Sequence, residues 1–163
     1  MKKIFSLTLV ILISYLFTSC TFNKAQYIKP GTKPKSNYYI EEIKNKLNEN
    51  EKYTLKIFDL NLYKYYDVDS TEHSIIPEFI DDLKTENYLS EFENNKIEPQ
   101  YKIIIEFSNQ KYIINAYNDS LISIYPWDGV YSEDIISIEG IPDYYNLYKF
   151  CEYIKKISNG FEG

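Results

Sequence analysis

The alternation of apolar and polar residues divides the chain after residue 36 into predicted strands and helices. From Tyr101 onwards apolar residues occupy every second position, the period that places them on one face of a β-strand. The polar pairs Asn109-Gln110 and Asn118-Asp119 interrupt this alternation, and such pairs favour tight turns. The pattern therefore predicts an antiparallel meander of three strands over residues 101–107, 111–117 and 120–125, with a further short strand over residues 135–138.

Three other stretches repeat apolar residues every three or four positions, as an amphipathic helix requires. The first predicted helix covers residues 37–50, and the last runs from Pro142 to Ser158. The middle helix has Pro77 in its first turn and is capped by Asp69, Ser70 or Ser74. The expected apolar faces are Ile40, Ile43 and Leu47 in the first helix, Ile76, Phe79, Ile80 and Leu83 in the second, and Tyr144, Leu147, Cys151 and Ile154 in the third.

A further strand is predicted between the first two helices. Tyr53, Leu55 and Ile57 alternate with polar residues, and the apolar phase then shifts, which indicates a bulge or turn near Asp59. One face of the resulting sheet is more apolar than the other and needs a cover that helices can provide. We therefore expect an α+β fold, an antiparallel meander sheet of about four strands with helices packed on one face.

The first twenty residues follow a different pattern. Lys2 and Lys3 precede an apolar run from residue 4 to 17, which is typical of a signal peptide. Leu16-Phe17-Thr18-Ser19-Cys20 resembles the bacterial lipobox, whose Cys receives a diacylglyceryl group before the signal peptidase cleaves in front of it. The alternative is an uncleaved anchor helix, but the apolar run is shorter than the ~20 residues that span a bilayer. We expect residues 1–19 to form the signal peptide and Cys20 to carry the lipid.

Charge divides the remaining chain into two parts. Residues 20–36 contain four Lys and no acidic residue, together with Pro30, Gly31 and Pro34, which indicates a basic flexible tether. Residues 37–163 contain all 24 acidic residues and 12 Lys, a net charge of −12 in a single acidic domain. Such a surface repels nucleic acid and anionic lipid and favours neutral or cationic partners. We expect no nucleic-acid partner.

Pro126-Trp127-Asp128-Gly129 ends the meander with residues that favour a turn. The turn holds the only Trp in the chain next to a carboxylate, an arrangement common in sugar-binding sites. Trp127, Asp128, Tyr125 and Tyr131 are therefore candidate ligand-binding residues. Turn chemistry alone also explains the group, and on that interpretation Trp127 is buried and Asp128 bonds the backbone of the turn. We favour the structural interpretation and expect a buried Trp127.

The sequence lacks the motifs of common enzyme classes. It contains no GxSxG, HExxH or P-loop motif, and we expect no catalytic residue and no cofactor. The enzymatic alternative is a small hydrolase that uses paired carboxylates, for example Asp128 with Glu133 or Asp134. Since the chain has 24 acidic residues, some such pair is always available, and the signal carries little weight.

The residues that often form metal or redox sites also favour structural roles. The stretch from Asp67 to Glu78 has the length of a calcium loop, but Glu72 occupies the position that requires Gly. His73 is the only His and is expected to be solvated at a helix start. With Cys20 lipidated, Cys151 has no disulfide partner and is expected to be a buried, inert thiol. We expect no metal site.

Several motifs resemble an uncharacterised family of small clostridial lipoproteins. They are the hairpin strand Tyr112-Ile-Ile-Asn-Ala-Tyr117, the segment Ile124-Tyr-Pro-Trp-Asp-Gly129, and Ile141-Pro142 followed by Tyr145-Asn-Leu-Tyr148 and Cys151. The resemblance covers most of residues 37–158 and implies no activity, because the family has no known function. Together with the lipobox it leads us to expect a lipid-anchored protein on the extracytoplasmic face of the cell membrane.

Two classes of function fit this sequence. The first is a non-enzymatic binding module for an envelope protein, a peptide or a glycan, which needs no catalytic group. The alternative is the small carboxylate-dependent hydrolase or a dedicated sugar-binding protein. A cleft with converging, desolvated carboxylates favours the enzyme, whereas a convex surface with an apolar patch favours binding.

Overall fold

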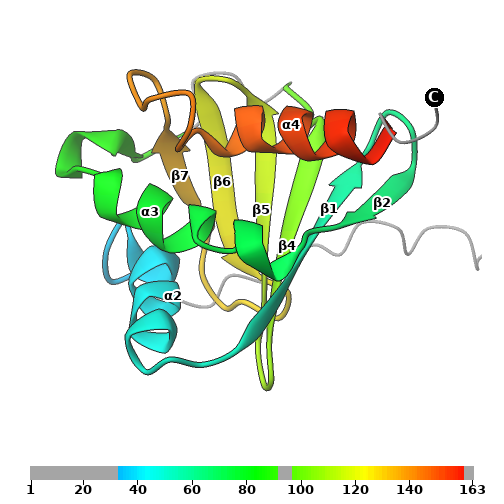
Figure 1. The fold of residues 1–163 in the computed structure, drawn as a ribbon. Coiled ribbons are helices and arrows are strands. Elements are labelled where there is room, and N and C mark those ends of the chain that lie inside the picture. The colour runs from blue at the N-terminus through cyan, green and yellow to red at the C-terminus, as the bar shows by residue number, and fades with distance from the viewer. Residues whose placement is uncertain (1–32, 92–96, 160–163) are drawn as a thin grey trace, which may run out of the picture.

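The computed structural model of the chain describes residues 33–91 and 97–159. Within these ranges the chain forms a seven-stranded antiparallel sheet with the strand order β2-β1-β4-β5-β6-β7-β3 (Figure 1). The strands are β1 (Tyr53–Asp59), β2 (Lys64–Asp67), β3 (Tyr88–Leu89), β4 (Tyr101–Phe107), β5 (Lys111–Asn118), β6 (Leu121–Pro126) and β7 (Asp134–Ser137).

The predicted meander forms the middle of this sheet. β4, β5, β6 and β7 follow one another in sequence and in space, and β1 adds to β4 in the register that pairs Leu55 with Ile105. The number of strands differs from the expected four, because the two edge strands β2 and β3 carry weak sequence signals. β2 follows β1 through a turn just after Asp59, and only Tyr66 of its four residues is buried. β3 is two residues long and pairs with β7.

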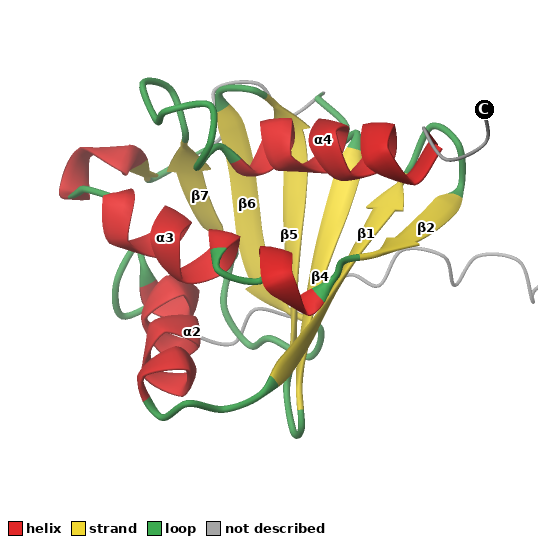
Figure 2. Ribbon diagram, in the orientation of Figure 1, coloured by secondary structure: helices red, strands yellow, loops and turns green. Residues whose placement is uncertain are grey.

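Three α-helices in the described residues cover one face of the sheet (Figure 2). They are α2 (Tyr38–Asn48), α3 (Ile75–Asp82) and α4 (Leu147–Asn159), and short 3-10 turns occur at Ser70–Glu72 and Thr85–Asn87. Ile40 of α2, Phe79 of α3 and Cys151 of α4 belong to the same buried cluster as the inward residues of the strands. The α+β class and the position of the helices are therefore confirmed.

The third helix begins later than the expected Pro142. Pro142 instead begins a turn. The Pro142 carbonyl oxygen accepts hydrogen bonds from the N–H groups of Tyr145 and Asn146. Asn146 then caps α4, since its Oδ1 accepts from the N–H groups of Tyr148 (3.0 Å) and Lys149 (3.2 Å). Tyr144 consequently lies outside the helix with 70% of its surface exposed, so its predicted place on the apolar face is wrong.

Two residues with candidate chemistry are part of the packing. Cys151 is fully buried, as expected, and burial raises the pKa of its thiol well above the ordinary value. His73 is half-buried rather than solvated, because its ring stacks on Tyr53 at 5.0 Å. The Tyr53 hydroxyl also donates to the His73 carbonyl oxygen at 2.7 Å. Asp69 accepts from the N–H of Thr71 and caps the 3-10 turn.

The predicted signal peptide, Cys20 and most of the predicted tether lie outside the described residues. Among the helices that the structure describes, none is long and apolar enough to cross a membrane. Lys33, near the end of the predicted tether, contacts the domain directly. Its ammonium donates to the Glu133 carbonyl (2.8 Å) and to Asp134 Oδ1 (2.9 Å) on and beside β7.

Candidate ligand-binding cleft

A cleft of about 520 Å³ lies beside α2 at one end of the sheet. One wall is the polar side of α2, and the opposite wall is the loop that follows β6, from Pro126 to Tyr131. The turn between β4 and β5, with Asn109 and Gln110, closes a third side. The cleft therefore joins three segments that are far apart in the sequence.

Tyrosines form the contact between the helix and the loop. The rings of Tyr38 and Tyr131 meet edge to face with their centroids 5.1 Å apart, and both side chains are half-buried. The buried Tyr39 hydroxyl donates to the Tyr131 carbonyl oxygen (3.1 Å) and accepts from the Tyr131 N–H (2.9 Å). These two hydrogen bonds fix the loop against α2, so this wall of the cleft is held in place by the fold itself.

Gly129 allows the loop to approach the helix this closely. Its N–H donates to the Pro126 carbonyl oxygen, which closes the turn. A Cβ atom on Gly129 would lie 2.7 Å from the Pro126 ring and 2.9 Å from the Tyr39 hydroxyl oxygen, well inside van der Waals contact. Any larger residue would therefore push the loop away from Tyr39 and open the cleft.

Glu42 places a carboxylate among the tyrosines. Its Oε2 accepts a hydrogen bond from the Tyr112 hydroxyl at 3.1 Å. Tyr38 also hydrogen-bonds to Glu42, and this bond raises the pKa of the Tyr38 phenol. Burial, followed by the charge of Glu42, raises the pKa of Tyr112 as well. Both phenols therefore remain protonated at neutral pH, and Tyr112 acts as a hydrogen-bond donor to Glu42.

Lys46, the one Lys among the described residues that line the cleft, is already bound to other side chains. The Lys46 ammonium donates to Glu51 Oε1 (3.1 Å) and to Asn109 Oδ1 (3.1 Å), and it lies 5.3 Å from the centre of the Phe107 ring. Within the described part of the chain, Glu42 and Asp128 form no ion pair. The cleft thus carries negative charge that no described Lys neutralises.

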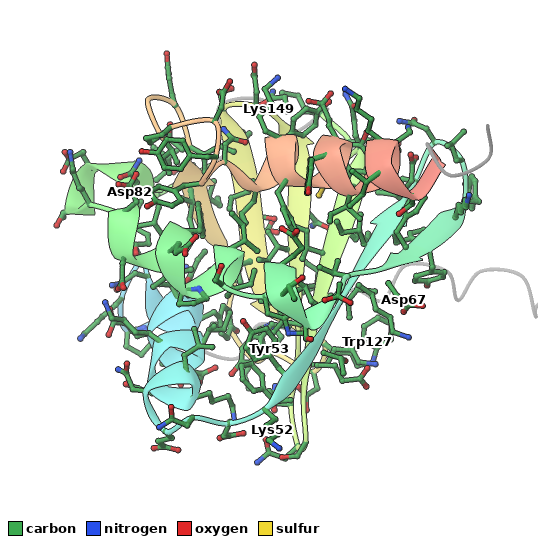
Figure 3. The ribbon with its side chains drawn as sticks, in the orientation of Figure 1. Lys52, Tyr53, Asp67, Asp82, Trp127 and Lys149 are labelled. Atoms are coloured by element: carbon green, nitrogen blue, oxygen red, sulfur yellow. The ribbon has the colours of Figure 1, made fainter. Side chains whose placement is uncertain are left out.

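The prediction that Trp127 is buried is wrong, because 70% of its surface is exposed. Pro126, which is buried, is the last residue of β6 and pairs with Tyr112. Successive side chains of an extended strand point to opposite sides, so the next residue points away from the core. The Trp127 N–H continues the ladder by donating to the Lys111 carbonyl oxygen at 2.8 Å. Figure 3 shows Trp127 near the lower end of the sheet, far from α4.

Two of the four candidate ligand-binding residues line the cleft, and the other two do not. Asp128 and Tyr131 line the cleft, while Trp127 lines a neighbouring recess of about 280 Å³. Asp128 contributes to both hollows, and its Oδ1 accepts from Gln110 Nε2 at 2.8 Å rather than from its own turn. Tyr125 lines neither hollow. It lies within β6, where it pairs with Ile113 of β5.

The carboxylates suggested for a hydrolase do not form a pair in the cleft. Asp134 is fully buried, and its Oδ2 accepts from the N–H groups of Tyr39 (2.8 Å) and Ile40 (2.9 Å). It therefore caps α2 from β7, while its Oδ1 binds Lys33. Glu133 Oε2 accepts from the Ser123 hydroxyl at 2.6 Å. Neither Glu133 nor Asp134 lines the cleft.

Sequence reasoning missed the helix side of the cleft. Neither Tyr38 nor Glu42 belongs to the apolar face by which the first helix is predicted. Tyr38, Glu42 and Asn45 are spaced i, i+4 and i+7, so they form one stripe along α2 beside its apolar face. An aromatic residue and a carboxylate on one stripe of a predicted helix are the sequence signal that could have indicated a binding surface on α2.

The comparisons with known proteins place this domain in a family. The model of a domain of unknown function (DUF4883) matches residues 33–151, a range that contains the whole cleft. The chain belongs to this family. A crystal structure described as that of a "putative lipoprotein" from Clostridium perfringens is 31% identical, with a TM-score of 0.69 over 77% of this chain and 99% of that chain.

The DUF4883 family is thus one of uncharacterised clostridial lipoproteins, as the motifs around Trp127 and Cys151 led us to expect. No curated protein matches the sequence. The match begins at Lys33, the residue that binds Asp134 and so attaches the start of the domain to β7.

Proposed function

We propose that this DUF4883 lipoprotein is a non-enzymatic binding module, held on the extracytoplasmic face of the cell membrane by a lipid on Cys20. Its binding site is the cleft between α2 and the loop from Pro126 to Tyr131. The observation that carries the proposal is the wall of Tyr38 and Tyr131 beside Glu42, which forms no ion pair within the described residues. Half-buried aromatic rings with a few placed polar groups are what a preformed binding site offers.

The anchor rests on the lipobox and on the similarity to the Clostridium perfringens structure. Two acyl chains from one diacylglycerol suffice for stable attachment, where one chain gives only reversible binding. We expect Cys20→Ala to prevent thioether formation and to move the protein out of the lipidated membrane fraction. Cell fractionation with metabolic fatty-acid labelling checks this, and a variant that is still labelled and processed like the wild type would contradict it.

A photo-crosslinking experiment in cells tests the binding site. A photoreactive amino acid replaces Val130, which is 52% exposed and lines the cleft, and a control replaces Tyr63, which is 81% exposed in the turn between β1 and β2. We expect a discrete adduct from position 130 that position 63 does not give. The same adducts from both positions, or none from position 130, would contradict a binding role for the cleft.

A glycan is the second candidate ligand, and the exposure of Trp127 favours it. Stacking on a sugar requires an accessible aromatic face, and Trp127 lies beside Asp128 and Gln110, which can bond hydroxyl groups. Titration with neutral oligosaccharides tests this candidate, because a stacked sugar changes the fluorescence of the only Trp. No change at millimolar sugar would exclude it.

A further inference from the structure

The cleft has an excess of carboxylates over cations. Glu42, Glu49, Glu51 and Asp128 line it, and among the described residues Lys46 is the one Lys that does so. The Lys46 ammonium is paired with Glu51 and bonded to Asn109, which leaves Glu42, Glu49 and Asp128 without a described Lys partner. A ligand that enters this cleft therefore meets three such carboxylates, of which Glu42 lies at the tyrosine wall.

Glu42 is held so that it can accept further hydrogen bonds. Tyr112 donates to its Oε2 at 3.1 Å, and Tyr38 lines the cleft one helical turn away on α2. A carboxylate has about four acceptor positions, so Glu42 has capacity for a further donor. A compact ammonium suits the remaining space better than the planar guanidinium of Arg, which binds best when both carboxylate oxygens are available to it.

The walls beside Glu42 fit the rest of a lysine side chain. Tyr38 and Tyr131 present half-buried rings, and Val130 adds an exposed apolar side chain at the entrance. Methylene groups pack along such surfaces while the ammonium stays near the polar group at the end. An ammonium near a Tyr ring gains an additional attraction to the ring face.

The protein already binds one of its own lysines in this way. The Lys155 ammonium lies 2.7 Å from Asp59 Oδ2 and 5.7 Å from the centre of the Tyr101 ring. The combination of one carboxylate and one Tyr ring thus accommodates a Lys within this fold. Glu42 and Tyr38 offer the same pair of groups, but with no described Lys to fill the position.

We propose that the cleft recognises a lysine side chain of a partner peptide, with its ammonium on Glu42 and its methylene groups packed along the edge-to-face pair of Tyr38 and Tyr131. This inference rests on the proposed binding function and adds the chemical class of the ligand. It also agrees with the net charge of −12 over residues 37–163, which attracts cationic peptides before contact.

Titration of the full-length protein in a non-ionic detergent tests the inference. The probe is a tripeptide with a central Lys and blocked ends, and the matched control is the same peptide with its Lys ε-amine acetylated. We expect the unmodified peptide to bind at least about tenfold more tightly, because acetylation removes the charge that Glu42 recognises. Equal affinity of the two peptides would overturn the proposal.

A pair of variants locates the effect. Glu42→Gln keeps the shape and an acceptor oxygen but removes the charge, and we expect it to weaken binding of the Lys peptide at least about tenfold. Glu139→Gln makes the same charge change at an exposed position outside the cleft and should leave the affinity within about twofold. Circular-dichroism melts of both variants establish that they are folded. Equal losses in the two variants would overturn the assignment of Glu42.

Other probes separate this inference from the proposed function. If N-acetylglucosamine or another neutral sugar binds while the Lys peptide does not, the lysine assignment fails and the binding function stands. If glucosamine binds and the Lys peptide does not, the cleft recognises an amine but not that of a lysine in a peptide, and the lysine assignment fails while the binding function stands. If no probe binds and position 130 gives no adduct in cells, both proposals fail.

Discussion

Two pairs of carboxylates in this domain have opposite surroundings. Asp59 and Asp134 are both fully buried, and each accepts two backbone hydrogen bonds and one from a Lys ammonium. Glu42 and Asp128 lie at the cleft and receive hydrogen bonds from neutral phenol or amide groups. The first pair is bound by backbone N–H groups and a Lys within the fold, whereas the second faces the cleft without a described Lys partner. On the proposed function, the first pair is structural and the second contributes to binding.

The two buried aspartates connect distant parts of the chain. Asp59 holds the N–H groups of Asn61 and Leu62 in the turn after β1 and binds Lys155 of α4 at 2.7 Å. Asp134 connects β7 with the first turn of α2 and with Lys33. Since α2 forms one wall of the cleft, Asp134 also positions Tyr38 and Glu42 indirectly.

Asp134→Ala should have the largest effect on stability. The substitution removes the oxygen that accepts from the Tyr39 and Ile40 N–H groups and leaves Lys33 without its buried partner. We therefore expect the free energy of unfolding to fall by about 3–5 kcal/mol. Asp134→Asn keeps an oxygen at the Oδ2 position and should cost only about 1–2 kcal/mol. Urea unfolding of the two variants measures the difference. Equal losses would show that the cap of α2 is unimportant.

Asp59→Ala should have the next largest effect. It removes two backbone hydrogen bonds and one to an ammonium, and we expect a loss of about 1.5–3 kcal/mol. The loss should be smaller than that of Asp134→Ala, because the Lys155 side chain is 30% exposed and the Lys33 side chain only 13%, so water can solvate Lys155 more easily. A larger loss at Asp59 than at Asp134, measured by the same unfolding assay, would reverse this ranking.

Trp127→Ala should change the free energy of unfolding by less than about 0.5 kcal/mol, because the side chain is mostly exposed. A buried Trp would leave a cavity and cost about 3–5 kcal/mol instead. Urea unfolding again distinguishes the two values. The substitution should leave binding of the Lys peptide within about twofold, since Trp127 lies in the neighbouring recess.

The pH dependence of stability should distinguish the two buried aspartates. Burial raises the pKa of Asp59, but the Lys155 and backbone hydrogen bonds outweigh it and hold the pKa below the ordinary value of 3.8. Its stabilisation is therefore present above pH 3.8 and is lost as the pH falls through the folded pKa. For Asp134 burial prevails over the hydrogen bonds and the net pKa is raised, so stability should rise as the pH falls through its folded pKa towards 3.8.

Unfolding measurements across this pH range check both signs. Asp59→Asn should reduce the loss of stability that the wild type shows as the pH falls below 3.8. Asp134→Asn should remove the part of the stability that the wild type gains from Asp134 as the pH falls towards 3.8. We expect these to be the smallest effects of the series, since one pKa unit corresponds to about 1.4 kcal/mol. The same pH profile for the wild type and both variants would show that neither aspartate has a shifted pKa.

The parts of the fold that were predictable have a strong local pattern. Strand β4 alternates buried and less buried residues, the polar turns at Asn109-Gln110 and Asn118-Asp119 bound β5, and α2 and α3 have continuous apolar faces. β2 and β3 were missed because they are short edge strands. The last helix was placed too early because Pro142 is a common first helical residue, while the actual cap is Asn146.

The candidate site was harder to predict because it depends on contacts between distant residues. The hydrogen bond between Ile40 and Asp134 joins residues 94 positions apart, and no local pattern marks it. The exposure of Trp127 was within reach of the sequence, since a buried Pro126 at the end of β6 turns the next side chain outwards. The position of Glu42 in the cleft could not be predicted, because it depends on which strand and which loop face α2.

The most direct test of the division between structural and binding carboxylates is ligand-induced stabilisation. A ligand that binds only the folded state stabilises it by RT ln(1 + [L]/Kd), about 2.7 kcal/mol at a hundredfold excess over Kd. We predict that the Lys tripeptide raises the melting temperature of the wild type and of Asp59→Asn, which keeps the cleft, but not that of Glu42→Gln at the same concentration. An equal rise in Glu42→Gln and the wild type would contradict the account, because the cleft carboxylate would then contribute nothing to recognition.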